Sequence, residues 1–541
     1  MSSHPTSIWK RSPNKLRQGE IWLECFCFIS LFLAALVLFL VNLGNLPLID
    51  LKEGVVAQVA KEIYQGLWLG DNWLFPTLWG EPYLEQPTLV HDLIAIAYKV
   101  AGVSEFTTRL PGALLGAVSV LLLYNIGREI FVARLPALFS ALVYLTCLPV
   151  LRLSRLAMLD GPLLCFELLT IWAILRSRRD FRWSLLAGIG LGLMALTKGI
   201  LSLQILVIAI VFLLWDTPRL LASTYYWAGI ILGTAPAIAW YVSQWFRYHE
   251  FKTTGDFFQL FLGDISASTI QVQLFPEYYL LSGLQYLLPW LVVMAMGLKL
   301  ISLNLQWGWG KLLITWIGIY TLLSLLVFSQ GYWSILPLYP ALALAAGRQL
   351  DMVRNVPSYI AYPRIWIYSF MLMAAVAAFA GLYWGIRDYV DFYLPFICGS
   401  LAITFTVTAI AIAQREKQFV PLLFWGLFIS MFLLIISPHW IWEINAKEPI
   451  EPIATLIRNH TPAETIIYTS MPQERPSLNF YSDRKIVTQS LTQLKQTWQQ
   501  NYPVYLLIDP ITLEKLDLSQ QTVVKSSKFE SLKWVLAIKN S

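Results

Sequence analysis

Long apolar runs alternate with short polar connections over most of this chain. Thirteen runs lie near residues 21–43, 110–127, 135–151, 159–175, 183–197, 199–215, 225–242, 278–301, 310–328, 333–350, 365–385, 393–413 and 419–437. A bilayer requires roughly 20 apolar residues per helix. The pattern therefore predicts an α-helical polytopic membrane protein with about thirteen transmembrane helices, several of them short.

The loop at residues 44–108 departs from this pattern. Part of it repeats apolar residues at helical spacing, namely Val55, Val56, Val59, Ile63 and Leu67. This spacing predicts an amphipathic helix at the membrane surface. Two acidic clusters flank it, Asp50 with Glu53 and Glu81 with Glu85. Carboxylates held at the bilayer edge suggest chemistry on a lipid headgroup, and the alternative is a surface loop with solvated charges.

The basic residues predict the orientation. Residues 1–20 hold four of them, and most other arginines fall in connections on the same side. The positive-inside rule makes this side cytoplasmic. We therefore expect a cytoplasmic N-terminal tail at 1–20 and a transmembrane domain at 21–445. Its first loop, 44–108, and the C-terminus would be extracytoplasmic.

Residues 446–541 change character. Short β-rich segments at 465–469, 485–488, 504–509 and 533–539 alternate with helical patterns at 450–459 and 490–500. This predicts a small soluble α/β domain on the extracytoplasmic, periplasmic side. The tail has no glycine-rich strand–helix turn and no Walker pattern. A supporting or partner-binding role is the expectation there.

Composition narrows the function classes. The chain is 57% hydrophobic and 13% charged, which is typical of an integral membrane protein. The net charge of +6 is spread over short clusters between apolar runs, so no nucleic-acid partner is expected. The five cysteines lie in or beside apolar runs, which argues against a disulfide framework and a zinc ribbon.

Three carboxylates are candidates for chemistry. Asp160 stands at the outer mouth of a predicted helix, where a charge is costly unless it faces water or a partner. Arg152 and Arg155, one and two turns upstream, could pair with it or hold an anion; the alternative is a helix-end charge. Asp50 and Glu53 are spaced i, i+3 and could accept a proton from an attacking hydroxyl or amine. They could equally favour a helix N-terminus.

Other candidates lie at the predicted outer face. Arg109 and Lys198 could reach a phosphate, although each also fits an interfacial anchor. Tyr332 could line a lipid tail or headgroup, but aromatic belts look the same. His439 follows the last predicted helix, and a lone histidine is more often structural than a metal ligand.

Several segments together resemble a known family. In order they read VAQVAKEIYQG, YLEQPTL, SEFTTRLPGAL, RLAMLDGPL, LTKG, FPEYYLLSGLQYLLPW and FSQGYWSILPLYPALAL. This ordered set resembles the glycosyltransferases of the C-type (GT-C) fold that use lipid-linked sugars. The group holds the bacterial aminoarabinose transferases of lipid A and the protein O-mannosyltransferases. The resemblance covers most of the membrane part and is specific to the superfamily, not to a substrate.

The resemblance implies a reaction and a place. A sugar would move, with inversion, from a polyprenyl-phosphate donor to a lipid, glycan or protein acceptor at the outer face of a bacterial-type inner membrane. Membrane lipids would surround the enzyme, and no nucleotide sugar is needed. Asp50, Glu53 and Asp160 would be catalytic in one cavity.

The resemblance also suggests binding roles. Cations would hold the donor phosphate, and three further residues would contact the lipid or the sugar. The expected phosphate ligands are Arg109, Arg155 and Lys198, and the expected lipid or sugar contacts are Glu85, Gln86 and Tyr332.

The chain departs from the family at several positions. Where the family has Asp-Glu and then Arg in the first loop, this chain has Lys52 and Glu53 with Val55, so Asp50 would have to substitute. Gln86 replaces a lysine of the family. Glu85 and His439 match positions that bridge a metal in some aminoarabinose transferases, so a divalent metal is the one cofactor considered.

These departures keep a second interpretation open. The chain could be a catalytically inactive member that binds a lipid-linked sugar or scaffolds a membrane complex. A transporter fits less well, because transporters place polar groups near the midplane of repeated halves. In this chain the polar candidates cluster at one edge, and no half is duplicated.

Overall fold

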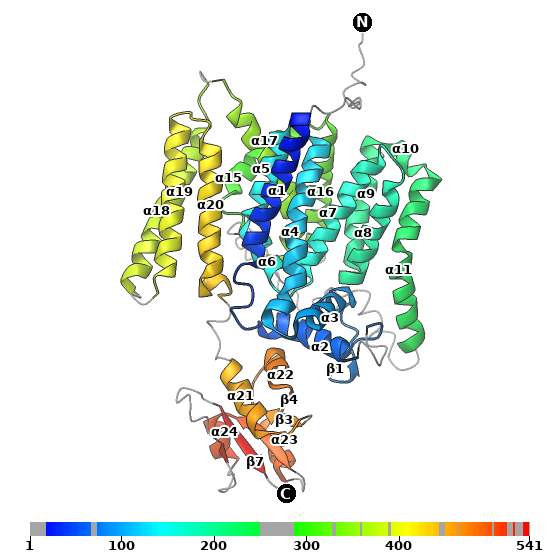
Figure 1. Ribbon diagram of the computed structural model, residues 1–541, viewed down its shortest axis with the longest axis vertical. Coiled ribbons are helices and arrows are strands. Elements are labelled where there is room, and N and C mark those ends of the chain that lie inside the picture. Colours follow the sequence, from blue (N-terminus) through cyan, green and yellow to red (C-terminus); the bar gives the residue numbers. More distant parts are fainter. Residues whose placement is uncertain are drawn as a thin grey trace.

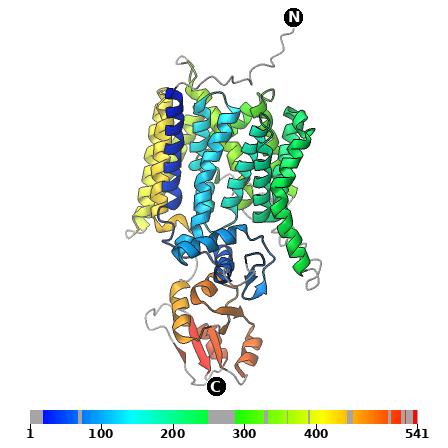
Figure 2. The same cartoon turned by 45° about the vertical axis from the view of Figure 1, so that its right-hand side comes forward.

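The computed structural model describes residues 18–66, 73–248, 286–326, 332–357, 360–387, 391–442, 450–463, 465–499, 503–516, 523–524 and 534–539. Two parts follow one another along the longest axis, a broad helical bundle and a smaller α/β part (Figure 1). The helices α2 and α3 lie across the end of the bundle that faces the α/β part (Figures 1 and 2).

Each predicted apolar run contains a helix, or part of one, among these residues. The bundle contains α1 (Gln18–Leu40), α4 (Glu105–Ile130), α5 (Arg134–Leu145), α6 (Leu148–Arg155), α7 (Asp160–Ser177), α8 (Trp183–Lys198), η2 (Gly199–Ser202), α9 (Leu203–Asp216), α10 (Pro218–Leu221), α11 (Thr224–Tyr248), α15 (Leu291–Ser302), α16 (Gly308–Leu326), η3 (Tyr332–Leu338), α17 (Tyr339–Arg354), α18 (Arg364–Arg387), α19 (Tyr393–Ala413), α20 (Phe419–Ile436) and η4 (Pro438–Trp440).

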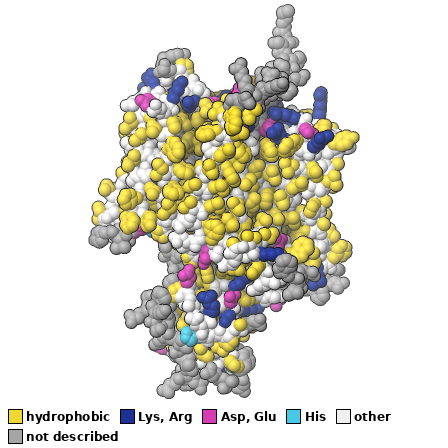
Figure 3. Space-filling view, in the orientation of Figure 1, with side chains coloured by type: hydrophobic (Ala, Val, Ile, Leu, Met, Phe, Trp, Pro, Cys, Tyr) yellow, Lys and Arg dark blue, Asp and Glu magenta, His cyan; other side chains and the backbone are white. Residues whose placement is uncertain are grey.

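Fewer helices than predicted are long enough to span a bilayer alone. Within the described residues, α1, α4, α18, α19 and α20 are long and apolar enough, and α5 with α6 makes a sixth span if that pair, bent by 59°, is one. Others, such as α8, α9 and α15, are apolar but shorter. On the face shown in Figure 3, a wide apolar belt crosses the bundle, with charged side chains above and below it. The chain is therefore a multi-pass integral membrane protein, although the count of thirteen spans stays a prediction.

Small residues bring the central helices together. An added Cβ at Gly116 of α4 would lie 2.7 Å from Ser154 Cβ of α6 and 2.9 Å from Phe39 Cε1 of α1. Such contacts leave no room for a larger side chain. Lipid tails are as apolar as the side chains, so the hydrophobic effect does not draw helices together within a membrane. Close packing of this kind holds them together instead.

The first loop folds against the end of the bundle. It contains η1 (Asp50–Gly54), α2 (Val55–Gly66), the antiparallel pair β1 (Thr77–Leu78) and β2 (Glu81–Pro82), and α3 (Leu89–Ala101). The predicted amphipathic helix is confirmed as α2, in which Val56, Val59 and Ile63 are buried. Leu67 lies outside the described residues.

The C-terminal residues form a mixed sheet flanked by helices. The elements are α21 (Ile450–His460), β3 (Ile466–Thr469), α22 (Pro476–Ser482), β4 (Lys485–Thr488), α23 (Leu491–Gln499), β5 (Val504–Ile508), α24 (Pro510–Lys515), β6 (Val523–Val524) and β7 (Val535–Lys539). The strand order is β4-β3-β5-β7-β6. β3 runs parallel to β4 and β5, and β7 runs antiparallel to β5 and β6. Each predicted β-rich segment overlaps a strand.

The helix α22 joins this sheet to the first loop. Phe480 is 5% exposed and packs in one cluster with Leu48, Val56 and Leu159. Gly54 meets the start of α22, where an added Cβ would lie 2.4 Å from the Ser477 backbone nitrogen. The first loop and the C-terminal part are thus in direct contact through α22.

We predict that Gly54→Ala loosens this contact. The new methyl group would lie 2.4 Å from a backbone atom that cannot rotate away, and overpacking of this kind costs about 1–3 kcal/mol. Hydrogen exchange of the α22 amides should accelerate, and the thermal unfolding temperature in detergent should fall. Gly399→Ala is the control, because nothing lies within 4 Å of its added Cβ. Equal protection of α22 in both variants would contradict the prediction.

Candidate active site

The two carboxylates of η1 have different partners. The π-turn is closed by the amides of Glu53 and Gly54, which both donate to the Ile49 carbonyl at 3.0 Å. Asp50 faces α22, where Arg475 Nε donates to its Oδ2 at 3.1 Å and the Ser477 hydroxyl donates to its Oδ1. Glu53 faces the bundle instead, so the two residues do not act on one shared face.

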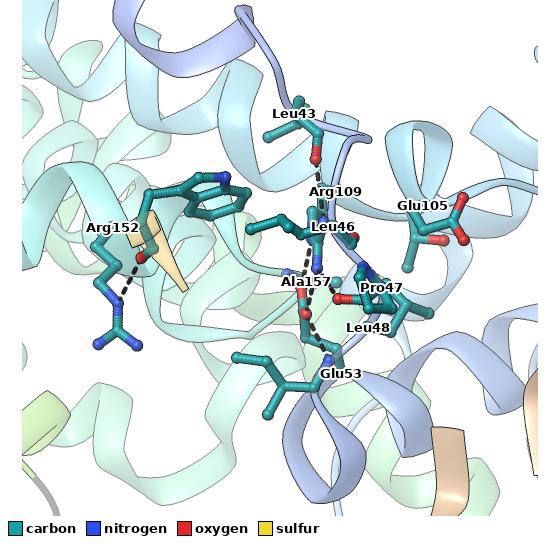
Figure 4. Close-up of polar contacts among 12 residues, drawn as sticks. Leu43, Leu46, Pro47, Leu48, Glu53, Glu105, Arg109, Arg152 and Ala157 are labelled. Carbon is teal, nitrogen blue, oxygen red and sulfur yellow. Dashed lines mark hydrogen bonds and ion pairs between the residues drawn. The ribbon is translucent and has the colours of Figure 1, made fainter. Parts of the chain in front are cut away.

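Glu53 forms a buried ion pair with Arg109 of α4 (Figure 4). Both side chains are 0% exposed. Arg109 Nε lies 2.8 Å from Glu53 Oε1, and Nη2 lies 2.7 Å from Oε2. The remaining N–H groups of Arg109 donate to the carbonyls of Leu43 at 3.1 Å, Leu46 at 2.7 Å and Pro47 at 2.9 Å. A guanidinium has five N–H donors, and these contacts use them all, so none remains for a phosphate.

Glu53 also fixes the chain next to Asp160. Its Oε1 accepts a hydrogen bond from the Ala157 amide at 2.8 Å, and its Oε2 accepts one from the Ile49 amide at 2.9 Å. The carboxylate therefore ties η1, α4 and the segment before α7 into one unit (Figure 4). Glu53 lies inside the protein rather than on an open surface.

We predict that Arg109→Met destabilises the protein by about 3–5 kcal/mol, because it leaves the Glu53 carboxylate buried without its counter-ion. Denaturant unfolding in detergent measures the change. The double variant with Glu53→Leu should lose less than the two single losses combined, since it removes both charges. Arg219→Met, at an exposed arginine of α10, is the control. A loss in Arg109→Met no larger than in the control would refute the prediction.

Asp160 is paired with Lys198. Asp160 opens α7 and Lys198 closes α8, and Nζ lies 2.9 Å from Oδ1. The side chains are 8% and 10% exposed. Gly161 lets α7 begin close to α6, because an added Cβ there would lie 2.7 Å from Ser154 Cα. A carboxylate and an ammonium are thus held at the same end of the bundle as the first loop.

Arg152 and Arg155 hold other parts of the fold. The Arg155 guanidinium donates to four carbonyls at the end of α1, those of Leu38, Phe39, Val41 and Asn42. It also lies 4.5 Å from the Trp440 ring centroid. Arg152 donates to the Trp440 carbonyl at 3.2 Å and stacks on Trp442 at 3.6 Å. The partner of Asp160 is therefore Lys198, rather than either arginine upstream.

The remaining predicted residues are spread over separate elements. Glu85 is exposed and Gln86 half-buried, both between β2 and α3. The side chain of Tyr332, at the start of η3, lies outside the described part of the chain. His439 Nε2 hydrogen-bonds to Asp391. Among the described residues, no three His, Cys, Asp or Glu side chains are grouped as a metal site would need, so a metal at Glu85 and His439 stays a prediction.

One apolar cluster brings the neighbours of the key carboxylates together. It contains Leu48, two residues before Asp50, and Leu159, which directly precedes Asp160. Phe480 of α22 belongs to the same cluster. The chain around Asp50, Asp160 and α22 therefore meets in one place, next to the Glu53 ion pair.

Arg475 is the residue that sequence reasoning missed. It lies in the C-terminal part, where no catalytic motif occurs, and 425 positions separate it from Asp50. Its only local signal is a basic residue directly before Pro476, the first residue of α22. Nothing in that pattern names a partner in the first loop.

The helix α3 of the first loop carries a partly buried acid, Asp92. Burial raises the pKa of Asp92 to about 7. A hydrogen bond with the Thr88 side chain lowers this pKa, but by less than burial raises it. Its Oδ1 is buried without a hydrogen-bond partner. The adjacent His91 is fully buried, which lowers its pKa to about 4. Desolvation thus favours the neutral form of both side chains.

We predict a pH-dependent stability that Asp92→Asn removes. The folded pKa of about 7 lies above the ordinary 3.8, so stability from Asp92 is full below about pH 4 and is lost as pH rises through 7. The lowered pKa of His91 makes stability fall as pH drops below 6.5, which is the opposite direction. The comparison is therefore made between pH 6.5 and 8. There the thermal unfolding temperature should fall further in the wild type than in Asp92→Asn. Parallel curves would contradict this.

Comparison with known proteins finds similarity to sugar transferases. Residues 85–242 match the family described as dolichyl-phosphate-mannose-protein mannosyltransferase. The undecaprenyl phosphate-alpha-4-amino-4-deoxy-L-arabinose arabinosyl transferase of Shewanella sediminis is 24% identical over 481 residues, covering 84% of each chain.

Two solved structures share the fold. ArnT from Cupriavidus metallidurans, bound to undecaprenyl phosphate, matches with a TM-score of 0.70 at 18% identity, over 94% of this chain and 98% of that one. The archaeal oligosaccharyltransferase AglB from Archaeoglobus fulgidus matches with a TM-score of 0.55 at 11% identity, over 91% of this chain and 70% of that one.

Proposed function

We propose that this chain, which has the GT-C-type fold of the aminoarabinose transferase and protein O-mannosyltransferase group, is a membrane glycosyltransferase. It moves a sugar from a polyprenyl-phosphate carrier to an acceptor, with inversion. An undecaprenyl-phosphate sugar is the donor class we favour. The relative from Shewanella sediminis is named for such a donor, and ArnT was solved with undecaprenyl phosphate. The acceptor is a lipid, glycan or protein with a nucleophilic hydroxyl or amine.

The reaction takes place on the extracytoplasmic side in this proposal. The chain crosses a bacterial-type inner membrane about thirteen times, with residues 1–20 in the cytoplasm and the domain at 446–541 outside. Basic side chains along the edge of the bundle where α1 begins support this orientation (Figure 3). The first loop, 44–108, and the C-terminal sheet share the opposite end (Figure 1).

The observation that carries the proposal is the Asp160–Lys198 ion pair. Sugar transfer from a phosphate carrier leaves a negative charge on the departing phosphate, which needs a cation placed in advance. Lys198 supplies that cation, and Asp160 holds its ammonium at 2.9 Å in the correct position. Lysine acts as a compact point charge and can share its three donors between the carboxylate and a phosphate.

The acceptor needs a base. We assign this part to Asp50, which takes the proton of the acceptor hydroxyl or amine as that group attacks the anomeric carbon of the sugar. The bond from this carbon to the phosphate oxygen breaks, and the polyprenyl phosphate leaves with the bonding electrons. A single displacement of this kind inverts the anomeric centre. Catalytic hydrogen bonds are often formed only when substrate binds, so the present contacts of Asp50 with Arg475 and Ser477 are compatible with this role.

Other candidates take supporting roles in the proposal. Glu53 and Arg109 hold the first loop on the bundle, and Arg155 anchors the end of α1. Glu85, Gln86 and Tyr332 remain proposed contacts for sugar or lipid. No step above depends on a metal at Glu85 and His439.

We predict that Asp50→Asn and Asp160→Asn each remove transfer while the protein still folds. Loss of a general base lowers the rate by about 100- to 10,000-fold, and loss of the group that orients Lys198 by about 100-fold or more. The measurement is mass spectrometry of surface lipids and glycans from cells that lack the gene and carry each variant.

The design separates chemistry from folding. Wild type and Asp180→Asn, an exposed acid in the connection between α7 and α8, should restore the sugar that the deletion removes. Detergent-purified Asp50→Asn and Asp160→Asn should elute as single species and unfold cooperatively. Full restoration by both variants would overturn the mechanism. An unchanged sugar profile in the deletion strain would overturn the function.

A further inference from the structure

The side of Asp50 that faces away from the bundle is covered by α22. Arg475 Nε lies 3.1 Å from Asp50 Oδ2, and the Ser477 hydroxyl donates to Oδ1. The Asp50 side chain is 2% exposed and that of Arg475 is 12% exposed. Both carboxylate oxygens are thus contacted by residues of the C-terminal part.

Further contacts fix α22 in this place. The Tyr481 hydroxyl accepts a hydrogen bond from the Leu48 amide at 2.9 Å and donates to Glu105 Oε1 at 2.9 Å. Lys61 of α2 forms an ion pair with Asp483 and lies 3.4 Å from the Phe480 carbonyl. The Phe480 ring is buried between these polar contacts, with Leu159 in the same cluster.

The properties of this contact indicate whether α22 stays in place, as a fixed wall of the site, or opens, as a lid would. Segments that open readily have few buried apolar contacts and solvent-exposed hydrogen bonds. The α22 contact has a buried aromatic ring, a backbone approach at Gly54 that admits no side chain, and an ion pair between the buried Asp50 and the largely covered Arg475. It has the properties of a permanent contact.

We propose that α22 is a fixed wall of the transfer site and that Arg475 is a positioning residue for Asp50. The proposal rests on the function assigned above. A carboxylate has about four acceptor lone pairs, so bonds from Arg475 and Ser477 are compatible with a further bond to a substrate hydroxyl. They hold the plane of the carboxylate, and a base displaced by about 1 Å can cost a factor of about 100 in rate.

The first test compares three variants. Arg475→Met should lower product formation at least tenfold in membranes from complemented cells. Arg475→Lys should recover part of this loss, because it restores a donor beside Asp50. Arg458→Met, at an exposed arginine of α21, should match the wild type.

A second readout separates positioning from loss of structure. Undecaprenyl phosphate should raise the thermal unfolding temperature of purified Arg475→Met and wild type equally, since Arg475 is paired with Asp50 and the proposed phosphate ligand Lys198 is paired with Asp160. Equal product from Arg475→Met and wild type would overturn the positioning role. So would parallel loss of product and of undecaprenyl phosphate binding, because that pattern marks a purely structural residue.

The wall itself is tested by locking it. Lys61→Cys with Asp483→Cys places two thiols at the edge of the contact, in a background with Cys25 and Cys398 changed to serine. Membranes containing this variant are assayed before and after a short bismaleimide links the pair, with each single cysteine variant as control. Retained product after linking supports the wall. Loss of product only in the linked double variant would show that α22 must leave, and would overturn it.

These outcomes are distinguishable from failure of the proposed function. If wild type restores no sugar in the deletion strain, the function and the positioning role both fall. If wild type restores the sugar but Arg475→Met does so equally, only the inference about Arg475 falls.

Discussion

The buried pair of Glu53 and Arg109 is the interaction on which the site depends. Two charges removed from water are tolerated only when their attraction and their hydrogen bonds offset the desolvation cost. Here every N–H group of Arg109 donates a hydrogen bond, and Glu53 accepts two backbone amides in addition. The same bonds hold the loop after α1, the η1 turn and the start of α7 in one arrangement. Asp50 and Asp160 therefore lie on elements that cannot shift independently.

The cations of this region divide into two kinds. Arg109 and Arg155 are fully buried, and their planar guanidinium groups donate several bonds each to carbonyl oxygens or to Glu53. Arginine suits such multiple, fixed contacts, and lysine acts as a movable point charge. Lys198 keeps some exposure and forms an ion pair with Asp160. Arg109 and Arg155 thus belong to the scaffold, and in the proposal above Lys198 is the cation that meets the substrate phosphate.

The C-terminal part is packed against the first loop through α22 and contributes side chains to the candidate site. It has no motif for chemistry of its own, yet α22 supplies Arg475 and Ser477 to Asp50 and Phe480 to the cluster around Leu159. Residues from the end of the sequence therefore hold a carboxylate of the first loop in place.

The sequence by itself determined the elements. Apolar runs marked the helices of the bundle, the spacing of Val56, Val59 and Ile63 marked α2, and short β-rich segments marked the strands of the tail. These features depend on local composition and period, which a single sequence displays. It also singled out Asp50, Glu53, Asp160, Arg109 and Lys198 as unusual charges at one edge.

Only the tertiary structure decided which charges meet. Arg109 and Glu53 are 56 residues apart, and Arg475 and Asp50 are 425 apart, so no local pattern joins them. An arginine that caps a helix, pairs with a buried carboxylate or binds a phosphate has the same local appearance. The difference lies in which acceptors the packed elements bring within about 3 Å of the guanidinium, and hydrogen bonding at that range is set by the fold as a whole.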